Sequence, residues 1–293
     1  MENLELPLSS RIAAPTARGS MVSVAGGRMA PDPGGLLNSG RQRDRYHRQV
    51  EYLDGFDQGP RFASWWLPAH AEPRGTVLSI QPLGEERHLA RRTLATQAHR
   101  LAARGWSVLM LDLFGTGDSP GDAADATLAL WRADLLRAAM LARRRSDGPN
   151  VLWGVRGGAL LTADIAVALD QLVDAYVFWQ APEDGRNIGA SMRVDGERLA
   201  SATMDELKLL RMQPPPTAEH GVQPMALFVE VQAAQGRDAP VSPLTCALTE
   251  SWLEAGYLAS PRAVCGRPFW RSARVPPPAD IFRATEEFLE GVR

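Results

Sequence analysis

The segment GVRGG (residues 154–158) has the spacing of a tight turn between a strand and a helix. The short, mostly apolar segment NVLW (residues 150–153) precedes it, and residues 157–172, rich in alanine and leucine, follow it. A turn of this kind exposes its middle residue at the end of the strand, where a serine can act as a nucleophile. The middle residue here is Arg156, whose guanidinium stays protonated and cannot attack a carbonyl carbon.

A second segment, GDSPG (residues 117–121), fits the pattern G-x-S-x-G but not its structural setting. Pro120 follows Ser119 directly and no helix is predicted to begin there, whereas a nucleophilic serine needs a strand before it and a helix after it. We therefore interpret Ser119 as a turn residue. Asp112 and Asp118 belong to the same glycine-containing segment, and we interpret both as turn residues rather than catalysts.

Apolar strands alternate with amphipathic helices along most of the chain. Strands are predicted at residues 61–69, 76–80, 106–113, 150–153, 175–179, 225–231 and 262–265. Helices are predicted at residues 88–105, 125–145, 157–172 and 279–292, and one more begins at the cap Ser242-Pro243. This alternation predicts an α/β fold, with a mostly parallel sheet covered by helices on both faces. Ligands of such folds bind beyond the carboxyl ends of the strands, which is where GVRGG lies.

The composition is that of a globular protein, with 45% hydrophobic residues and a formal net charge of -2. That charge gives no general attraction to nucleic acid or to an anionic membrane. No apolar run reaches the roughly 18 to 20 residues of a membrane span, and the N-terminus lacks the apolar core of a signal peptide. We therefore expect a cytoplasmic protein. The two cysteines, Cys246 and Cys265, are too few for a disulfide framework or a metal site, and we expect no metal and no cofactor.

Three segments resemble α/β-hydrolases, in the order in which that fold presents them: QPLG (residues 81–84), DLFGTGDSPGD (residues 112–122) and GVRGG. Within that superfamily the chain resembles the exosortase A system-associated hydrolases of the type called hydrolase 2. This resemblance rests on LDLFGTGDSPGDAADAT, LWGVRGGALL, VFWQAP and APVSP…WLEAG…CGRPFW, and it covers roughly residues 61 to 289. It implies an α/β-hydrolase fold and an association with gene clusters for exopolysaccharide production and protein sorting in Gram-negative bacteria.

The resemblance also implies where catalytic residues would stand. Gln81 and Leu83 occupy the place of the oxyanion loop, the pair Glu85 and Glu86 matches the family's P-x-x-E-E turn, and Asp238 occupies the place of the catalytic acid. The family's segment likewise carries arginine at the nucleophile turn. The catalytic base would be a histidine after the last predicted strand, at residues 262–265. No histidine occurs there, because all five lie earlier in the sequence: His47, His70, His88, His99 and His220. Two of the three triad members are therefore missing.

Three roles remain open for Arg156. It can pair with Glu85, Glu86 or Asp238 and hold the site together, because an unpaired buried charge is costly. It can bind the carboxylate or phosphate of a ligand, since the helix N-terminus beside it already favours anions. It can also be a solvated residue in a cleft without activity.

The candidate ligand-binding residues are those predicted at or near the strand ends: Gln81, Leu83, Glu85, Glu86, Val155, Gly157, Gln180 and Trp270. The aromatic residues Trp153, Trp179, Phe269 and Trp270 either line a pocket or pack in the core, and the sequence leaves both open. We expect a protein that binds a small anionic or acyl ligand. The alternatives are an active ester or thioester hydrolase or acyltransferase, in which Asp238, Glu85 or Glu86 activates water, and a protein–protein scaffold.

The chain is predicted to have a flexible arm at residues 1–40, which are poor in aromatic residues, followed by one α/β-hydrolase domain at residues 41–293. An insertion at about residues 183–222 interrupts the alternation of strands and helices. It forms either a cap over the site or a surface excursion without a role. The sequence does not specify an oligomeric state.

Overall fold

The structure is a computed structural model that describes residues 45–69, 71–169, 172–188, 193–194, 196–216, 223–233 and 240–293. All of these belong to one compact unit, Ser39–Arg293. The predicted arm at residues 1–40, and also Asp238, His70 and His220, lie outside the described residues.

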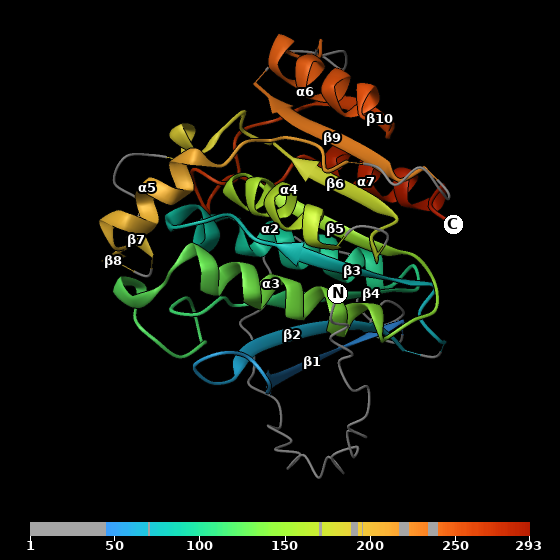
Figure 1. Cartoon of the computed structure of the whole chain (residues 1–293). Helices are drawn as coiled ribbons and strands as arrows, with labels where there is room; N and C mark the ends of the chain where they lie inside the picture. The colour runs from blue at the N-terminus through green and yellow to red at the C-terminus, as the bar shows by residue number, and fades with distance from the viewer. Residues whose placement is uncertain are drawn as a thin grey trace, which may run out of the picture. The chain divides into compact units, whose positions relative to one another are not determined.

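The described strands form an eight-stranded sheet in the order β1-β2-β4-β3-β5-β6-β9-β10 (Figure 1). Their bounds are Tyr46–Leu53 (β1), Arg61–Pro68 (β2), Gly75–Ile80 (β3), Trp106–Leu111 (β4), Asn150–Val155 (β5), Ala175–Trp179 (β6), Met225–Gln232 (β9) and Leu258–Cys265 (β10). β2 runs antiparallel to both of its neighbours, and the other pairs are parallel. The prediction of a mostly parallel sheet is confirmed.

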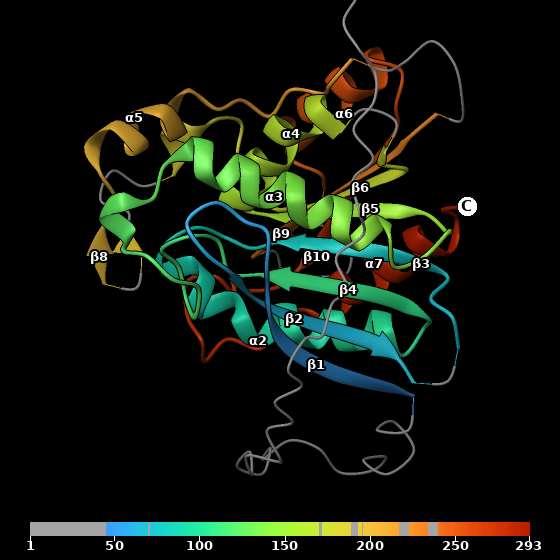
Figure 2. The same cartoon turned by 60° about the horizontal axis from the view of Figure 1, so that its bottom comes forward.

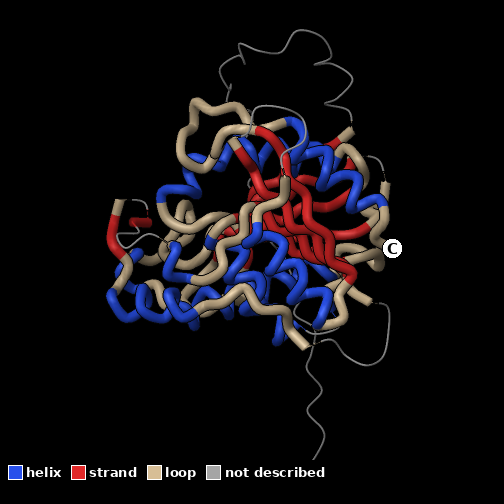
Figure 3. Tube along the Cα trace, turned by 90° about the horizontal axis from the view of Figure 1, so that it is seen from above, coloured by secondary structure: helices blue, strands red, loops and turns tan. Residues whose placement is uncertain are grey.

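Helices cover both faces of this sheet, as Figure 3 shows. One face carries α3 (Leu128–Arg143), α4 (Gly157–Leu169) and α6 (Pro243–Glu254), and the other carries α2 (Glu85–Ala102) and α7 (Ala279–Glu290). Successive side chains of a strand point to opposite faces, so in β4 Leu109 packs with the first group of helices and Val108 with the second. This double burial explains why the central strands are mostly apolar.

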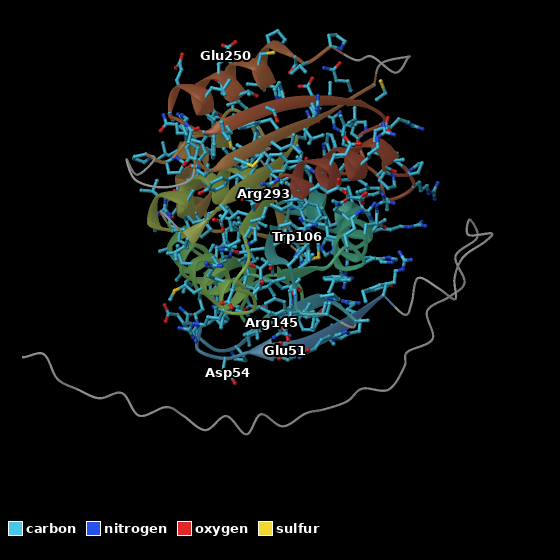
Figure 4. The ribbon with its side chains drawn as sticks, turned by 90° about the vertical axis from the view of Figure 1, so that its right-hand side faces the viewer. Glu51, Asp54, Trp106, Arg145, Glu250 and Arg293 are labelled. Atoms are coloured by element: carbon cyan, nitrogen blue, oxygen red, sulfur yellow. The ribbon has the colours of Figure 1, made fainter. Side chains whose placement is uncertain are left out.

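The two edge strands differ most from the sequence prediction. The sequence YHRQVEYL of β1 is mostly exposed and polar, so it carries little hydrophobic signal and was not predicted as a strand. Glu51 of this strand and Asp54 just after it lie at the outer edge of the sheet (Figure 4). β10 begins four residues before the predicted start, because an edge strand tolerates Pro261.

The insertion after β6 is folded onto the start of α3. It contains η3 (Gly185–Asn187), β7 (Arg193–Val194), β8 (Glu197–Arg198) and α5 (Ser201–Leu209), which lie together at one side of the molecule in Figures 1 and 2. Its two ends are joined where the N–H of Gly185 donates to the carbonyl oxygen of Leu210 at 3.0 Å. Thr203 of α5 donates to the carbonyl oxygen of Ala126 at 2.8 Å, which fastens the insertion to the segment before α3. Its role as a cap stays a prediction.

None of the helices within the described ranges combines the length and the apolar character that crossing a membrane requires.

A buried ion pair ties β2 to α3. The Nε of Arg61 lies 2.8 Å from Oδ2 of Asp134, and the two side chains are 0% and 1% exposed. The same oxygen accepts from the N–H of Phe114, so the pair also holds the turn after β4. Burial raises the pKa of Asp134, and the hydrogen bonds from Arg61 and Phe114 offset only part of that effect.

Removal of one member of this pair should be strongly destabilising. We expect Arg61→Leu to lower the free energy of unfolding by about 3–5 kcal/mol, because Asp134 is left buried without its partner. Replacing both residues by leucine should restore part of the loss. Urea denaturation of wild type and of the two variants measures both effects, and a loss below about 1 kcal/mol for Arg61→Leu would contradict the role given to the pair.

Candidate functional site

The GVRGG turn joins β5 to α4, with Arg156 at its corner. Arg156 has φ of 54°, in the left-handed region that non-glycine residues rarely adopt. A side chain at position 158 would put its Cβ 2.3 Å from the carbonyl oxygens of Ile80 and Gln81, and one at position 154 would meet Thr162 at 2.4 Å. The two glycines therefore let α4 start directly against the sheet, and the turn has the strand–turn–helix geometry expected from the sequence.

The side chain of Arg156 forms an ion pair with Glu86. Its Nε lies 3.1 Å from Oε2 and its Nη2 lies 3.1 Å from Oε1, so the guanidinium binds the carboxylate of Glu86 bidentately. The guanidinium also stands 5.3 Å from the centre of the Trp270 ring. The side chains are 21% and 31% exposed, so the pair is half-buried. Glu86 is one of the three partners that the sequence allowed.

The pair joins the beginnings of two helices. Glu86 lies in the first turn of α2, and Arg156 immediately precedes α4. A carboxylate stabilises a helix N-terminus, whereas a cation there is unfavourable, so Glu86 compensates the charge of Arg156. Glu85, the second acidic residue of the same turn, is exposed.

The loop after β3 lies against the turn at Arg156 through Leu83. A Cβ at position 157 would lie 3.1 Å from Leu83, and both positions are buried. Val155 has no exposed surface, so neither its side chain nor its backbone is accessible to a ligand in this structure. The side chain of Gln81 faces β4 instead of the turn, and its Nε2 donates to the carbonyl oxygen of Leu111 at 3.2 Å.

The segment after β4 is a turn held by its own polar residues. Asp112 accepts from the N–H of Asp118 at 3.0 Å and pairs with Arg87 of α2 at 2.8 Å. The hydroxyl of Ser119 accepts from the N–H of Phe62 at 2.9 Å and donates to the carbonyl oxygen of Asp112. Asp112, Asp118 and Ser119 lie in this turn, as predicted, and the absence of a catalytic role stays a prediction.

The aromatic residues near the strand ends pack in the core. Trp153, Trp179, Phe269 and Trp270 are all buried, and the first two rings meet edge to face at 4.6 Å. The indole N–H of Trp179 donates to Thr285 at 2.9 Å. Burial of all four residues therefore favours core packing over a pocket lining. Trp270 in addition contacts the guanidinium of Arg156 with its ring.

A buried carboxylate that the sequence analysis missed fixes the end of β9. Glu230 is 3% exposed, and it accepts hydrogen bonds from the N–H of Ser242 at 2.7 Å, from the hydroxyls of Ser242 and Thr245, and from the amide of Gln232. Burial by itself raises the pKa of Glu230, but these hydrogen bonds outweigh it and hold the pKa below its ordinary value. The sequence does contain a sign of this buried carboxylate, because Glu230 is the one charged residue in the apolar run MALFVEV. This network caps α6 just after the segment that contains Asp238.

Gln180 lies at the end of the neighbouring strand β6. It has φ of 49°, and its Oε1 accepts from the N–H of Val231 at 2.8 Å. Its side chain therefore joins the ends of β6 and β9, which is a structural role.

The histidines within the described ranges lie on other elements. His47 is on β1, His88 is on α2 and lines a cavity beside β2, and His99 near the end of α2 stacks on Tyr46 at 4.1 Å. Burial, and then the charge of Arg100, lower the pKa of His99. The same ranges hold no group of three or more His, Cys, Asp or Glu residues that could bind a metal.

Two cavities adjoin the loop after β3. The first, of about 20 Å³, is lined mainly by apolar residues of β3, β4 and α3 and has room for about one water molecule. The second, of about 100 Å³, lies between β2 and α2, and its lining combines apolar residues with polar and charged ones. No residue of the GVRGG turn lines either of these two cavities, and the turn is in contact with the loop after β3 that both cavities adjoin.

Comparisons with known proteins give structural similarity without sequence similarity. No model of a protein family matches the sequence, and a sequence comparison with curated proteins found no match. Est1E from Butyrivibrio proteoclasticus superposes with a TM-score of 0.60 at 15% identity, covering 82% of this chain and 97% of that one. Brefeldin A esterase, a bacterial homologue of human hormone sensitive lipase, gives 0.54 at 14% identity, covering 87% and 77%. A thioesterase domain from the curacin biosynthetic pathway gives 0.52 at 13% identity, covering 83% and 99%. The chain has the α/β-hydrolase fold.

Substitutions at Arg156 separate the ion pair from the strained backbone. We expect Arg156→Ala to lower the melting temperature by about 2–4 °C, because the pair and the contact with Trp270 are worth roughly 1 kcal/mol. Arg156→Gly should be less harmful, since glycine adopts the left-handed conformation without strain. An unchanged melting temperature for Arg156→Ala would remove the stabilising role, and a double-mutant cycle with Glu86→Ala measures the coupling directly.

The pKa of Glu230 predicts a pH dependence of stability. A carboxylate whose folded-state pKa is depressed stabilises the protein above its unfolded pKa and loses that contribution as the pH falls through the folded value. We expect Glu230→Gln to lose about 1.5–3 kcal/mol near neutral pH, with the difference from wild type shrinking below the ordinary glutamate pKa of 4.5. Urea denaturation of wild type and Glu230→Gln, at neutral pH and below pH 4.5, measures this difference in the free energy of unfolding. A difference that does not change with pH would show that the charge of Glu230 is immaterial.

Proposed function

We propose that this chain is a binding protein with the α/β-hydrolase fold, which recognises a small anionic or acyl ligand and does not carry out Ser-His-Asp hydrolysis. The observation that carries the proposal is the position of Arg156. A guanidinium stands at the corner of the strand–turn–helix, where the mechanism needs a hydroxyl, and it is held by Glu86 and Trp270. Following the sequence resemblance, we place this function in exosortase-linked exopolysaccharide systems.

Recognition of an anion at this turn requires an exchange of partners. Glu86 already supplies a carboxylate to Arg156, at the distances that a ligand carboxylate would take. A ligand therefore displaces Glu86 or binds the remaining edge of the guanidinium. The apolar cavity lined by Leu111, Leu113 and Trp131 lies beside the loop after β3, but it has room for about one water molecule, so an acyl chain would enter it only after these side chains move.

An active esterase, thioesterase or acyltransferase with a non-standard site is the second candidate. It is favoured by the structural similarity to Est1E and to the curacin thioesterase domain. In that case Asp238, Glu85 or Glu86 activates water, and Arg156 stabilises the developing negative charge.

Ester hydrolysis distinguishes the two candidates. We expect wild type and Arg156→Ala to hydrolyse p-nitrophenyl acetate and butyrate equally slowly, with no labelling by a fluorophosphonate probe. Arg156→Ser is the matched control that returns a hydroxyl to the turn, and it should stay unlabelled because no histidine is expected to act as its base. Turnover by wild type that is lost in Arg156→Ala would favour the catalytic candidate instead.

Glu86→Gln tests the exchange of partners. Removal of the internal carboxylate should let butyrate raise the melting temperature more in Glu86→Gln than in wild type, since the ligand no longer competes with a tethered anion. The double variant with Arg156→Ala should lose this response. Equal responses in Glu86→Gln and in the double variant would show that butyrate does not bind at Arg156.

A further inference from the structure

The polar cavity of about 100 Å³ between α2 and the first strands is the strongest candidate for a second binding site. Figure 2 shows α2 lying beside β2. The lining residues that matter to its chemistry come from β1, β2, α2 and the loop after β4: Arg48, Ser64, Trp66, Arg87, Arg91 and Asp112.

Sheet register and helix periodicity bring these residues together. Arg48 of β1 is directly opposite Trp66 of β2, so both point to the same face of the sheet, and Ser64, two residues earlier, shares that face. α2 covers this face. Arg87 and Arg91 are four residues apart on α2 and therefore lie on one side of the helix.

Two of the three guanidiniums are held in place. Arg48 donates to the hydroxyl of Ser64 at 2.9 Å, and its guanidinium lies 5.0 Å from the centre of the Trp66 ring. Arg87 pairs with Asp112 at 2.8 Å. Side chains that are already ordered lose little conformational entropy when a ligand binds, so Arg48 and Arg87 are preorganised, whereas Arg91 is exposed on α2.

The cavity carries an excess of positive charge. Asp112 is the only carboxylate among the described residues that line it, and it faces three arginines. Desolvation, and then the charge of Arg91, lower the pKa of Arg48, which means that the two guanidiniums repel each other. Like charges held together without a matching carboxylate reduce stability, and an anion between them removes that repulsion.

We propose that this cavity binds a multiply charged tetrahedral oxyanion, namely phosphate or sulfate, free or as a monoester, between Arg48 and Arg91. The guanidinium fork matches the oxygens of such an anion bidentately. The volume is well above the space that one water needs, while a tethered group can extend into solvent. The site does not include Arg156, so it goes beyond the function proposed for the turn.

Calorimetric titration with inorganic phosphate tests the site, with sodium chloride keeping the ionic strength constant. We expect one phosphate per chain, bound at least tenfold more weakly by Arg48→Gln and by Arg91→Gln. Arg144→Gln, which removes an exposed arginine at the end of α3, is the matched control and should bind as wild type does. Arg156→Ala should also bind as wild type does, and sulfate should compete whereas acetate should not.

Each other outcome overturns the proposal in a recognisable way. Absence of saturable binding to wild type removes the site, and equal weakening in Arg144→Gln reveals non-specific charge attraction. Loss in Arg156→Ala alone would assign phosphate to the turn, which supports the proposed function and rejects this cavity. Equal affinity for acetate would reject the oxyanion class. Melting temperatures in phosphate-free buffer establish that every variant is folded.

Discussion

The candidate site depends on the close approach of α4 to the sheet. The backbone at positions 154 and 158 lies so near to Thr162 and to the carbonyl oxygens of β3 and its loop that no side chain fits there. This approach forces the chain to turn within one residue, and the left-handed conformation of Arg156 is the result. The position of that residue is therefore fixed by packing, whatever its chemistry is.

Arginine at this corner reverses the electrostatics of the fold's usual arrangement. A serine there is small and neutral, and the helix N-terminus beside it is available for a developing negative charge. Arg156 adds a cation to the N-terminus of α4, which already carries a partial positive charge. The carboxylate of Glu86, from the first turn of α2, neutralises that cation. The protein thus supplies its own anion where a hydrolase would bind a reacting one.

The sequence predicted the parts that follow from periodicity and from local turn chemistry. The buried strands and the cap at Ser242 were found because their apolar runs and capping residues act locally. β1 was missed because an exposed edge strand has no apolar pattern. The sequence limited the possible partners of Arg156 to three acidic residues. Which of them forms the pair depends on how α2 and α4 are placed relative to each other, and local sequence patterns do not determine that placement. The cluster around Arg48 was missed for the same reason, because its residues are scattered over 65 positions of the sequence.

The two basic sites should differ in the ligands that they can hold. At the turn, Glu86 is tethered within hydrogen-bond distance of Arg156, and its effective concentration exceeds that of any free carboxylate in solution. Exchange of one carboxylate for another also brings little net free energy, so a ligand there needs apolar burial beside the loop after β3 as well as its charge. At Arg48 and Arg91 the described part of the cavity offers Asp112 alone, and that carboxylate is already bound to Arg87. On the two proposals, charge by itself would therefore drive binding in the cavity, whereas the turn would select for a ligand with an apolar part.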